Sequence, residues 1–191
     1  MDKIDLTERQ RAMVAAWERH TTAEFVEKDV DATMATMTAD PFVNSVPVMA
    51  GGGGSAGVRE FYARFFLPGN PDDTAARQVA RTVGQDRIVD ELIHSFTHDI
   101  EMPWILPGVP PTGKRVEVAL VAVVQFEGDK ISGERIYWDQ ASVLAQVGLL
   151  DPARLPICGA ESARKVLDVT SEPANALIER GFLEATADGP R

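Results

Sequence analysis

The chain has 191 residues, of which 45% are hydrophobic and 25% charged, and this balance is typical of a globular protein with one substantial core. Its 29 acidic residues outnumber its 19 basic ones and give a formal net charge of -10 at pH 7. Such a charge repels nucleic-acid backbones and anionic membrane surfaces, and the lysines and arginines form no dense basic run. We therefore expect neither a nucleic-acid partner nor a membrane partner.

The only cysteine, Cys158, excludes an intrachain disulfide and a multi-cysteine zinc site. The N-terminal residues are too polar for a signal peptide, and no stretch approaches the roughly 18 apolar residues of a membrane span. We expect a soluble, cytoplasmic protein. The three histidines are dispersed, without an evident histidine–carboxylate ligand spacing, so we expect no metal site and no cofactor.

The first 70 residues show mainly helical periodicity. Apolar residues recur at helical spacing after Thr7, which is well placed as an N-cap, and His20 on this helix is interpreted as a surface residue. Asp40-Pro41 ends the second of three helices. In chain order, we predict helix 9–27, helix 30–38, strand 42–46, a flexible glycine-rich turn at 50–54 and helix 55–67.

After residue 75 the residue pattern is typical of β-strands, with predicted turns at 84–86 and 127–129. The predicted strands are 76–83, 87–100, 116–127 and 130–141. The fold class is therefore α+β: a cone-shaped, curved antiparallel sheet covered by three N-terminal helices. Such a sheet leaves a concave, mostly apolar hollow, and this is where we expect a ligand site.

Apolar density falls after Leu150, and prolines recur in the residues that follow. We therefore divide the chain into a pocket domain, residues 1–150, and a peripheral tail, residues 151–191. Weak helical patterns at 161–167 and 173–185 indicate packing against the body or against a partner subunit. Disorder of the final residues is an equally good interpretation.

Three stretches carry a family resemblance: Ile93–His98, Leu106–Lys114 and Ile131–Leu150. In the SnoaL-like branch of the nuclear-transport-factor-like superfamily, a Thr-His strand is followed by a Pro-Thr-Gly turn and then by a strand that ends in an Asp shortly before Gln-Leu-Gly. The corresponding residues are Thr97-His98, Pro111-Thr112-Gly113, Asp139 and Gln146-Val147-Gly148. The chain resembles this family over residues 10–150. The resemblance implies a nuclear-transport-factor-like fold, but the superfamily includes enzymes and non-enzymatic binding domains, so fold alone does not settle function.

His98 and Asp139 match the family's catalytic positions. The resemblance implies that Asp139 is a general acid/base on a carbon acid and that His98 places substrate oxygens. A carboxyl group in an apolar cavity has a raised proton affinity, which suits it to shuttle a proton near neutral pH. The alternative is a hydrogen-bonded pair that only satisfies two buried polar groups.

Strand parity supplies further candidates. Arg135 and Tyr137 share the parity of Asp139 and point inward if it does, whereas Trp138 then faces the other side. Alternatively, Arg135 pairs with a glutamate at the surface and Tyr137 is ordinary core. The full set of predicted substrate-binding residues is Asn44, Asp90, Glu91, Phe96, Trp104, Arg135, Tyr137 and Trp138.

Asp90 and Glu91 lie in the middle of an apolar strand, so one of the two must face inward. The inward carboxylate pairs either with His98 or with an arginine, and a buried salt bridge is as good an interpretation as catalysis. His94 shares the parity of Asp90. Asn44 lies near the position of the general base in ketosteroid isomerases, and because an amide is no base it argues against steroid isomerase chemistry.

Our leading hypothesis is a cofactor-independent enzyme that moves a proton on a small, hydrophobic, carbonyl-bearing molecule, as a cyclase, isomerase or dehydratase does. The alternatives are an epoxide or lactone hydrolase using the same pocket and a non-catalytic ligand-binding or dimerisation module. We also expect a homodimer that forms through an exposed apolar face of the sheet. The residues assigned to that face are Val118, Leu120, Ala122, Val124 and Trp138.

Overall fold

The first helix begins at the predicted cap. Thr7 Oγ1 accepts a hydrogen bond from the Gln10 backbone N–H, and the Gln10 side chain accepts one from the Thr7 N–H. This capping box fixes the start of helix α1 (Glu8–Thr22) in the computed structural model, which describes residues 6–187. Helix α1 runs directly into a π-helical turn, η1 (Ala23–Glu27), so the predicted helix over 9–27 is confirmed.

The remaining elements follow the predicted order with two additions, a second strand and a helix after the last strand. They are α2 (Val30–Ala35), β1 (Met37–Ser45), β2 (Ala50–Gly53), α3 (Gly54–Phe61), the π-helical turn η2 (Tyr62–Phe66), β3 (Ala75–Val83), β4 (Arg87–Thr97), β5 (Arg115–Glu127), β6 (Lys130–Trp138), α4 (Gln140–Gln146), α5 (Glu161–Leu167) and α6 (Ala176–Ala187).

The glycine-rich segment is a strand, and the prediction of a flexible turn at 50–54 is wrong. Strand β2 pairs antiparallel with β1, with Gly51 opposite Asn44. Gly51 has φ of 147°, and a Cβ at this position would lie 1.9 Å from the Val43 carbonyl oxygen. Glycine is therefore needed here because the two backbones approach too closely for a side chain.

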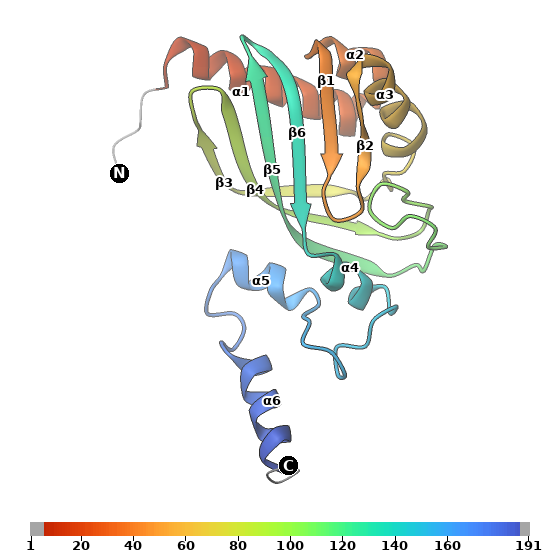
Figure 1. Ribbon diagram of the computed structural model, residues 1–191, viewed down its shortest axis with the longest axis vertical. Coiled ribbons are helices and arrows are strands. Elements are labelled where there is room, and N and C mark those ends of the chain that lie inside the picture. The colour runs from red at the N-terminus through yellow and green to blue at the C-terminus, as the bar shows by residue number, and fades with distance from the viewer. Residues whose placement is uncertain (1–5, 188–191) are drawn as a thin grey trace.

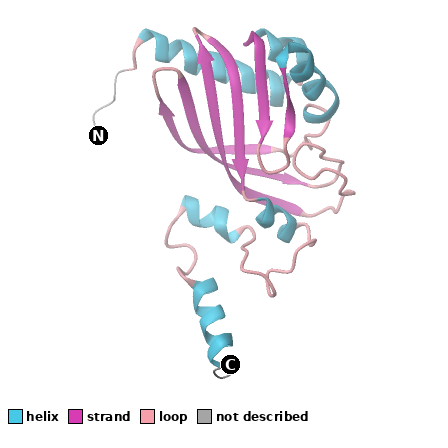
Figure 2. Cartoon of the chain, in the orientation of Figure 1, coloured by secondary structure: helices cyan, strands magenta, loops and turns pink. Residues whose placement is uncertain are grey.

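Six strands form one curved sheet in the order β2-β1-β6-β5-β4-β3 (Figures 1 and 2). Strands β1 and β6 are parallel, and all the other neighbours are antiparallel. Register shifts in β1, β3 and β5 mark irregularities of the kind that bend and twist a sheet. Helix α1 crosses one face and packs against β4 and β6. The α+β fold class expected from the sequence is confirmed.

Strand β5 shows which face of the sheet is the core. Val118, Leu120, Ala122 and Val124 are all buried, so the prediction that they form an exposed apolar face is wrong. Alternation along a strand separates two faces but does not say which one the helices cover. Trp138 lies on the same buried face, with 8% of its surface exposed.

The last strand is shorter than predicted. Strand β6 ends at Trp138, and Asp139 is the N-cap of α4, where its carboxylate accepts hydrogen bonds from the Ala141 and Ser142 N–H groups. The carboxylate satisfies backbone donors that a helix start leaves free, so the chain turns out of the sheet at this residue.

The tail contains the two expected helices. Helix α5 coincides with the predicted segment and packs against β5, with Ala163 buried in the contact. Helix α6 points away from the sheet (Figure 1). Within residues 6–187, no helix is both long and apolar enough to span a bilayer.

Candidate active site

A cavity of about 210 Å³ lies inside the curve of the sheet, between β1, β3–β6, helices α1 and α3, the turns η1 and η2, and Trp104 of the loop after β4. Aromatic and aliphatic side chains make up most of its wall. Four charged side chains also face it: Glu24, Arg81, Asp90 and Glu134. A mainly apolar cavity with a few convergent polar groups is the usual form of a small-molecule site.

The two π-helical turns present residues to this cavity. Glu24 and Phe25 belong to η1, and Tyr62 and Phe66 belong to η2. A π-helical turn changes the angular register of a helix, and such turns are frequent at functional sites. The strand residues alternate instead: Asp90, Leu92 and His94 of β4 line the cavity, and so do Glu134 and Ile136 of β6.

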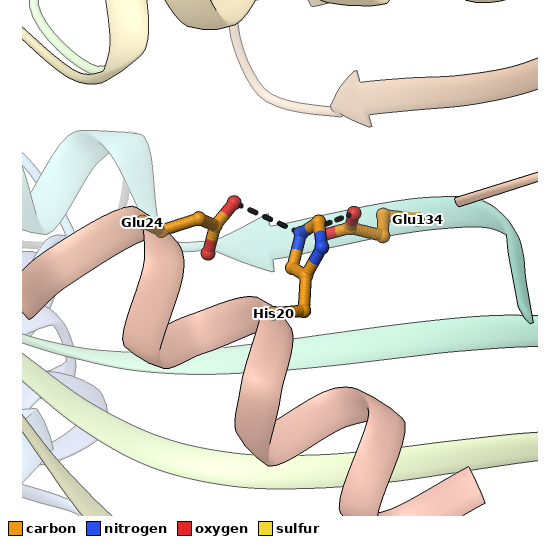
Figure 3. A group of neighbouring side chains, drawn as sticks. All are labelled: His20, Glu24 and Glu134. Carbon is orange, nitrogen blue, oxygen red and sulfur yellow. Dashed lines mark hydrogen bonds and ion pairs between the residues drawn. The ribbon is translucent and has the colours of Figure 1, made fainter. Parts of the chain in front are cut away.

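A buried histidine joins the two glutamates (Figure 3). The His20 Nε2 atom lies 3.1 Å from an oxygen of Glu24 and 3.1 Å from an oxygen of Glu134. The Tyr62 hydroxyl is also 3.1 Å from His20 Nε2, and it donates to Glu134 Oε1. His20 is fully buried, so the prediction that it is a surface residue is wrong.

The hydrogen bonds determine the protonation of His20. The Thr36 hydroxyl donates to the Thr33 carbonyl oxygen and therefore accepts from His20 Nδ1–H, at 2.6 Å. Nε2 faces two carboxylates and holds a second proton. Burial disfavours the imidazolium, but the attraction of Glu24 and Glu134 outweighs it and raises the pKa of His20 from 6.5 to about 10. At neutral pH this histidine is a buried cation.

Burial also shifts the neighbouring acids. It raises the pKa of the Glu24 carboxyl above its ordinary value, although the charge of His20 opposes the rise. The pKa of Tyr62 lies well above its ordinary value because of burial and of both glutamates, so the phenol stays protonated. The cluster therefore has one cation between two carboxylates, and Glu24 is the carboxyl group with the raised proton affinity.

The same three residues could hold a metal ion, since one donor atom from each of His20, Glu24 and Glu134 lies within 4.8 Å of the other two. His20 and Glu24 are one helical turn apart, so the expectation that no histidine and carboxylate have a ligand spacing is wrong. A nitrogen that binds a metal ion cannot also carry a proton, so a metal ion and a protonated His20 Nε2 are alternative states of this cluster.

Asp90 forms a second polar group in the cavity wall. Its carboxylate accepts from Trp17 Nε1 at 2.8 Å and from Arg81 Nε and Nη2 at 2.7 and 2.8 Å. Asp90 is 2% exposed, and Trp17 stacks on the His20 ring with 5.5 Å between the ring centroids. The expected pairing with an arginine is thus found, and Glu91 does not line the cavity. Three donors satisfy this carboxylate, which suits it to hold Arg81 in place.

The structure does not bring His98 and Asp139 together. His98 is buried beyond the end of β4, where its Nδ1 contacts the Thr112 hydroxyl at 3.1 Å, and it does not line the cavity. Asp139 is exposed and caps α4. The expectation that these two groups converge on one hollow is wrong, because Asp139 lies past the last inward-facing residues of β6.

Three further candidates lie on the outer side of the sheet. Tyr137 is 42% exposed, Asn44 is exposed, and the Arg135 guanidinium lies 4.6 Å from the centroid of the Phe42 ring. None of the three lines the cavity, so their predicted inward orientation is wrong. Glu134 and Ile136 occupy the inward positions of β6 instead, which is a parity opposite to that predicted.

The aromatic candidates have mixed positions. Trp104 lines the cavity, as predicted, and its Nε1 donates to the Gly69 carbonyl oxygen. Trp138 packs edge-on against Trp104 and Phe96 is buried beside His94, but neither lines the cavity. These two residues lie behind the cavity wall and pack against residues that line it.

Five residues of the site were not predicted from the sequence: His20, Glu24, Tyr62, Arg81 and Glu134. Glutamate is usually a surface residue. Only the position of Glu24 on an otherwise apolar helix face, and of Glu134 on an otherwise apolar strand face, could have identified them as site residues. The pairing of Arg81 with Asp90 had a usable signal, because the two residues lie symmetrically on either side of the turn between β3 and β4.

Comparison with known proteins relates the chain to a protein family. Residues 7–147 match the family model described as SnoaL-like polyketide cyclase. Among curated protein sequences, none matches the chain. A solved structure from Jannaschia sp. CCS1, assigned to the SnoaL-like polyketide cyclases, superposes with a TM-score of 0.64 and 18% identity, covering 78% of this chain and 99% of that one.

Two other solved structures are similar. A protein of ketosteroid isomerase-like fold from Catenulispora acidiphila, in complex with trimethylamine, has a TM-score of 0.54 and 19% identity over 72% of this chain and 93% of its own. The epoxide hydrolase/cyclase-like enzyme SalBIII of salinomycin pyran ring formation has a TM-score of 0.53 and 18% identity over 71% and 96%. At these identities the likeness establishes a shared fold, which is nuclear-transport-factor-like.

Proposed function

The chain belongs to the SnoaL-like polyketide cyclase family, and we propose that its cavity carries out acid–base proton transfer on a small, hydrophobic, carbonyl-bearing molecule. The reaction would be of the cyclase, isomerase or dehydratase type. One observation carries the proposal: the carboxylates of Glu24 and Glu134 face a mostly apolar cavity while a single buried imidazolium holds them from behind.

The size of the cavity limits the substrate. Its volume of about 210 Å³ exceeds the roughly 150 Å³ of an engineered apolar cavity that binds benzene. It lies below the roughly 300 to 1,000 Å³ of sites for drug-sized ligands. A molecule with one ring and a carbonyl substituent matches this volume, whereas a fused polycyclic molecule exceeds it.

We assign the proton-transfer step to Glu24. Burial raises the pKa of its carboxyl group above the ordinary value of a glutamate, and a carboxylate with a higher proton affinity is a stronger general base. Glu134 accepts a hydrogen bond from Tyr62 and lies 3.1 Å from His20 Nε2, and these two contacts fix the position of its carboxyl group.

His20 stabilises the charge that moves during the reaction. When Glu24 removes a proton from the carbon next to the carbonyl group, the negative charge passes from Glu24 to the substrate. The His20 imidazolium lies 3.1 Å from the Glu24 oxygen before the transfer, so its positive charge stays beside the region where the charge develops. A fixed charge in a site shielded from water lowers the barrier more than it would in bulk water.

The test is exchange of carbon-bound hydrogen with solvent deuterium. Wild-type protein is incubated in deuterated buffer with a panel of single-ring β-diketones and aryl ketones, and deuterium at the carbon next to the carbonyl is followed by NMR. We expect Glu24→Gln to slow exchange by about 10²- to 10⁴-fold. The exposed Glu60→Gln serves as control, because Glu60 lies outside the cavity and pairs with Arg64 at the surface. Exchange that Glu24→Gln leaves unchanged would remove Glu24 as the base.

The Asp90–Arg81 pair favours a second candidate, hydrolysis of a small epoxide or lactone. Arg81 and two carboxylates, Asp90 and Glu134, line one cavity. Such a set can orient a water molecule and activate an electrophile together. Incubation with styrene oxide in water enriched in ¹⁸O distinguishes the two functions, since hydrolysis places the label in a diol, whereas proton transfer alone releases no labelled diol.

We also propose that two copies of the chain pair through the outer face of the sheet. Ala119, Val121 and Val123 of β5 lie on that face, next to the half-exposed Tyr137 of β6. The residues that were expected from the sequence to form the dimer interface are buried, and this outer face takes their place in the proposal. Light scattering on wild type and on Val121→Lys tests the proposal, which predicts a dimer for wild type and a monomer for the variant.

A further inference from the structure

His94 is a polar residue in the cavity wall that the acid–base cluster does not use. It lies on β4 two residues beyond Leu92, and its side chain lines the cavity. Its ring is enclosed by aromatic groups: the centroids of Trp104 and Phe96 are each 5.5 Å away, and that of Phe25 is 6.5 Å away. Only 2% of the residue is exposed.

The Nε2 atom of His94 is buried and has no hydrogen-bond partner among the described residues. A buried polar atom without a partner is costly, and native proteins seldom retain one without a reason. Four other such atoms occur within residues 6–187, on Asn70, Thr74, His98 and Ser132, and none of these residues lines the cavity. Among the described residues that line the cavity, His94 is thus the one with a fully buried side-chain atom that lacks a partner.

The ring of His94 is neutral. Burial, together with the positive charge of Arg115, lowers its pKa from 6.5 to about 4. A neutral imidazole is a donor at one nitrogen and an acceptor at the other, and it brings no net charge into the cavity. It therefore differs from His20, which is a cation, and it suits an uncharged ligand group better than a carboxylate or phosphate.

We infer that His94 is a specificity-determining residue whose ring N–H donates a hydrogen bond to the carbonyl oxygen of an uncharged, single-ring ligand, while the aromatic groups around it hold the ring. Among the described residues, the charged groups of the cavity wall are three carboxylates and one guanidinium, and Arg81 is already bound by Asp90 and Glu18. An anionic ligand would meet net repulsion, whereas a ketone needs only a neutral donor.

This inference rests on the proposed function for the choice of a carbonyl ligand, but its test needs binding and no turnover. The probes are acetophenone and α-methylstyrene, which has a CH₂ group in place of the carbonyl oxygen and nearly the same shape. The dissociation constant of each is measured by NMR titration for wild type, His94→Phe, His94→Gln and His98→Phe. His98→Phe is the matched control, because His98 also has a buried, unpartnered Nε2 but lies outside the cavity.

We expect the ratio of the two dissociation constants to shift against the ketone by about three- to ten-fold in His94→Phe, the range that one net hydrogen bond produces. His94→Gln, which keeps an N–H donor, should restore part of the preference, and His98→Phe should leave the ratio unchanged. Addition of acetophenone should also move a ring ¹⁵N resonance of His94 in wild type, a response that a purely structural histidine does not give.

An equal ratio in wild type and in folded His94→Phe would overturn the inference, and so would an unmoved ¹⁵N resonance at saturating acetophenone. Failure of the deuterium-exchange test with an intact His94-dependent ketone preference would overturn only the proposed chemistry. The two results are therefore separable.

Discussion

The charge on His20 should make the stability of the protein depend on pH in a defined window. The native pKa is about 10, whereas an unfolded histidine titrates near 6.5, so the native state binds the proton more tightly. The stabilisation is complete below pH 6.5 and is lost as pH rises toward 10. Within this window each pH unit lowers the free energy of unfolding by about 1.4 kcal/mol, which amounts to on the order of 3 kcal/mol between pH 7 and 9.

The perturbation that tests this is the double substitution Glu24→Gln and Glu134→Gln. It removes both charges that raise the His20 pKa but keeps groups that can hydrogen-bond to the ring. We expect the wild-type decline between pH 7 and 9 to disappear, because burial then keeps His20 neutral in the native state. Urea unfolding at several pH values measures this, with Glu60→Gln as an exposed control. Equal pH slopes for wild type and the double variant would refute the assignment of a buried imidazolium.

Three further substitutions test other parts of the structure by urea unfolding. Asp139→Ala should cost about 1 kcal/mol through the lost cap of α4 and Asp139→Asn much less, whereas equal large losses would contradict a capping role. Asp90→Asn should cost about 3 kcal/mol, because the 2% exposed carboxylate is bound by Arg81 and Trp17, and a loss below 1 kcal/mol would show that the pair is unimportant. Gly51→Ala should cost more than about 2 kcal/mol, since its Cβ would overlap a backbone oxygen, while Gly53→Ala, which has open space, should be nearly neutral; similar values for both would refute the close approach.

The fold could be predicted from the sequence because its signals are local. The capping residue Thr7 and the turns around residues 84–86 and 127–129 depend on neighbours along the chain. The stop predicted at Asp40-Pro41 is wrong, because α2 ends at Ala35 and both residues lie within β1. The glycine strand β2 could not be predicted in this way. Its glycines are required by the closeness of β1 across the sheet, and no local pattern reports that contact.

The candidate site was predictable only in part. Asp90 and Trp104 were expected in the pocket and line it. The predicted orientation of β6 was wrong because the sequence from Glu134 to Trp138 places polar and apolar residues on both faces of the strand. The position of Asp139 in the family motif then suggested the wrong parity. The actual inward residue, Glu134, is a buried charge, and such a residue becomes interpretable only when its partner His20, 114 positions earlier in the chain, is seen beside it.

The proton-transfer role of the cavity is tested most directly by comparing two carboxylates in the deuterium-exchange assay. Glu24 faces the cavity and contacts His20, whereas Asp139 is exposed and caps a helix. With a single-ring β-diketone, Glu24→Gln should lose at least about 100-fold in exchange rate, and Asp139→Asn should remain within about two-fold of wild type. Loss of exchange in Asp139→Asn with retention in Glu24→Gln would contradict the assignment of the reaction to this cavity.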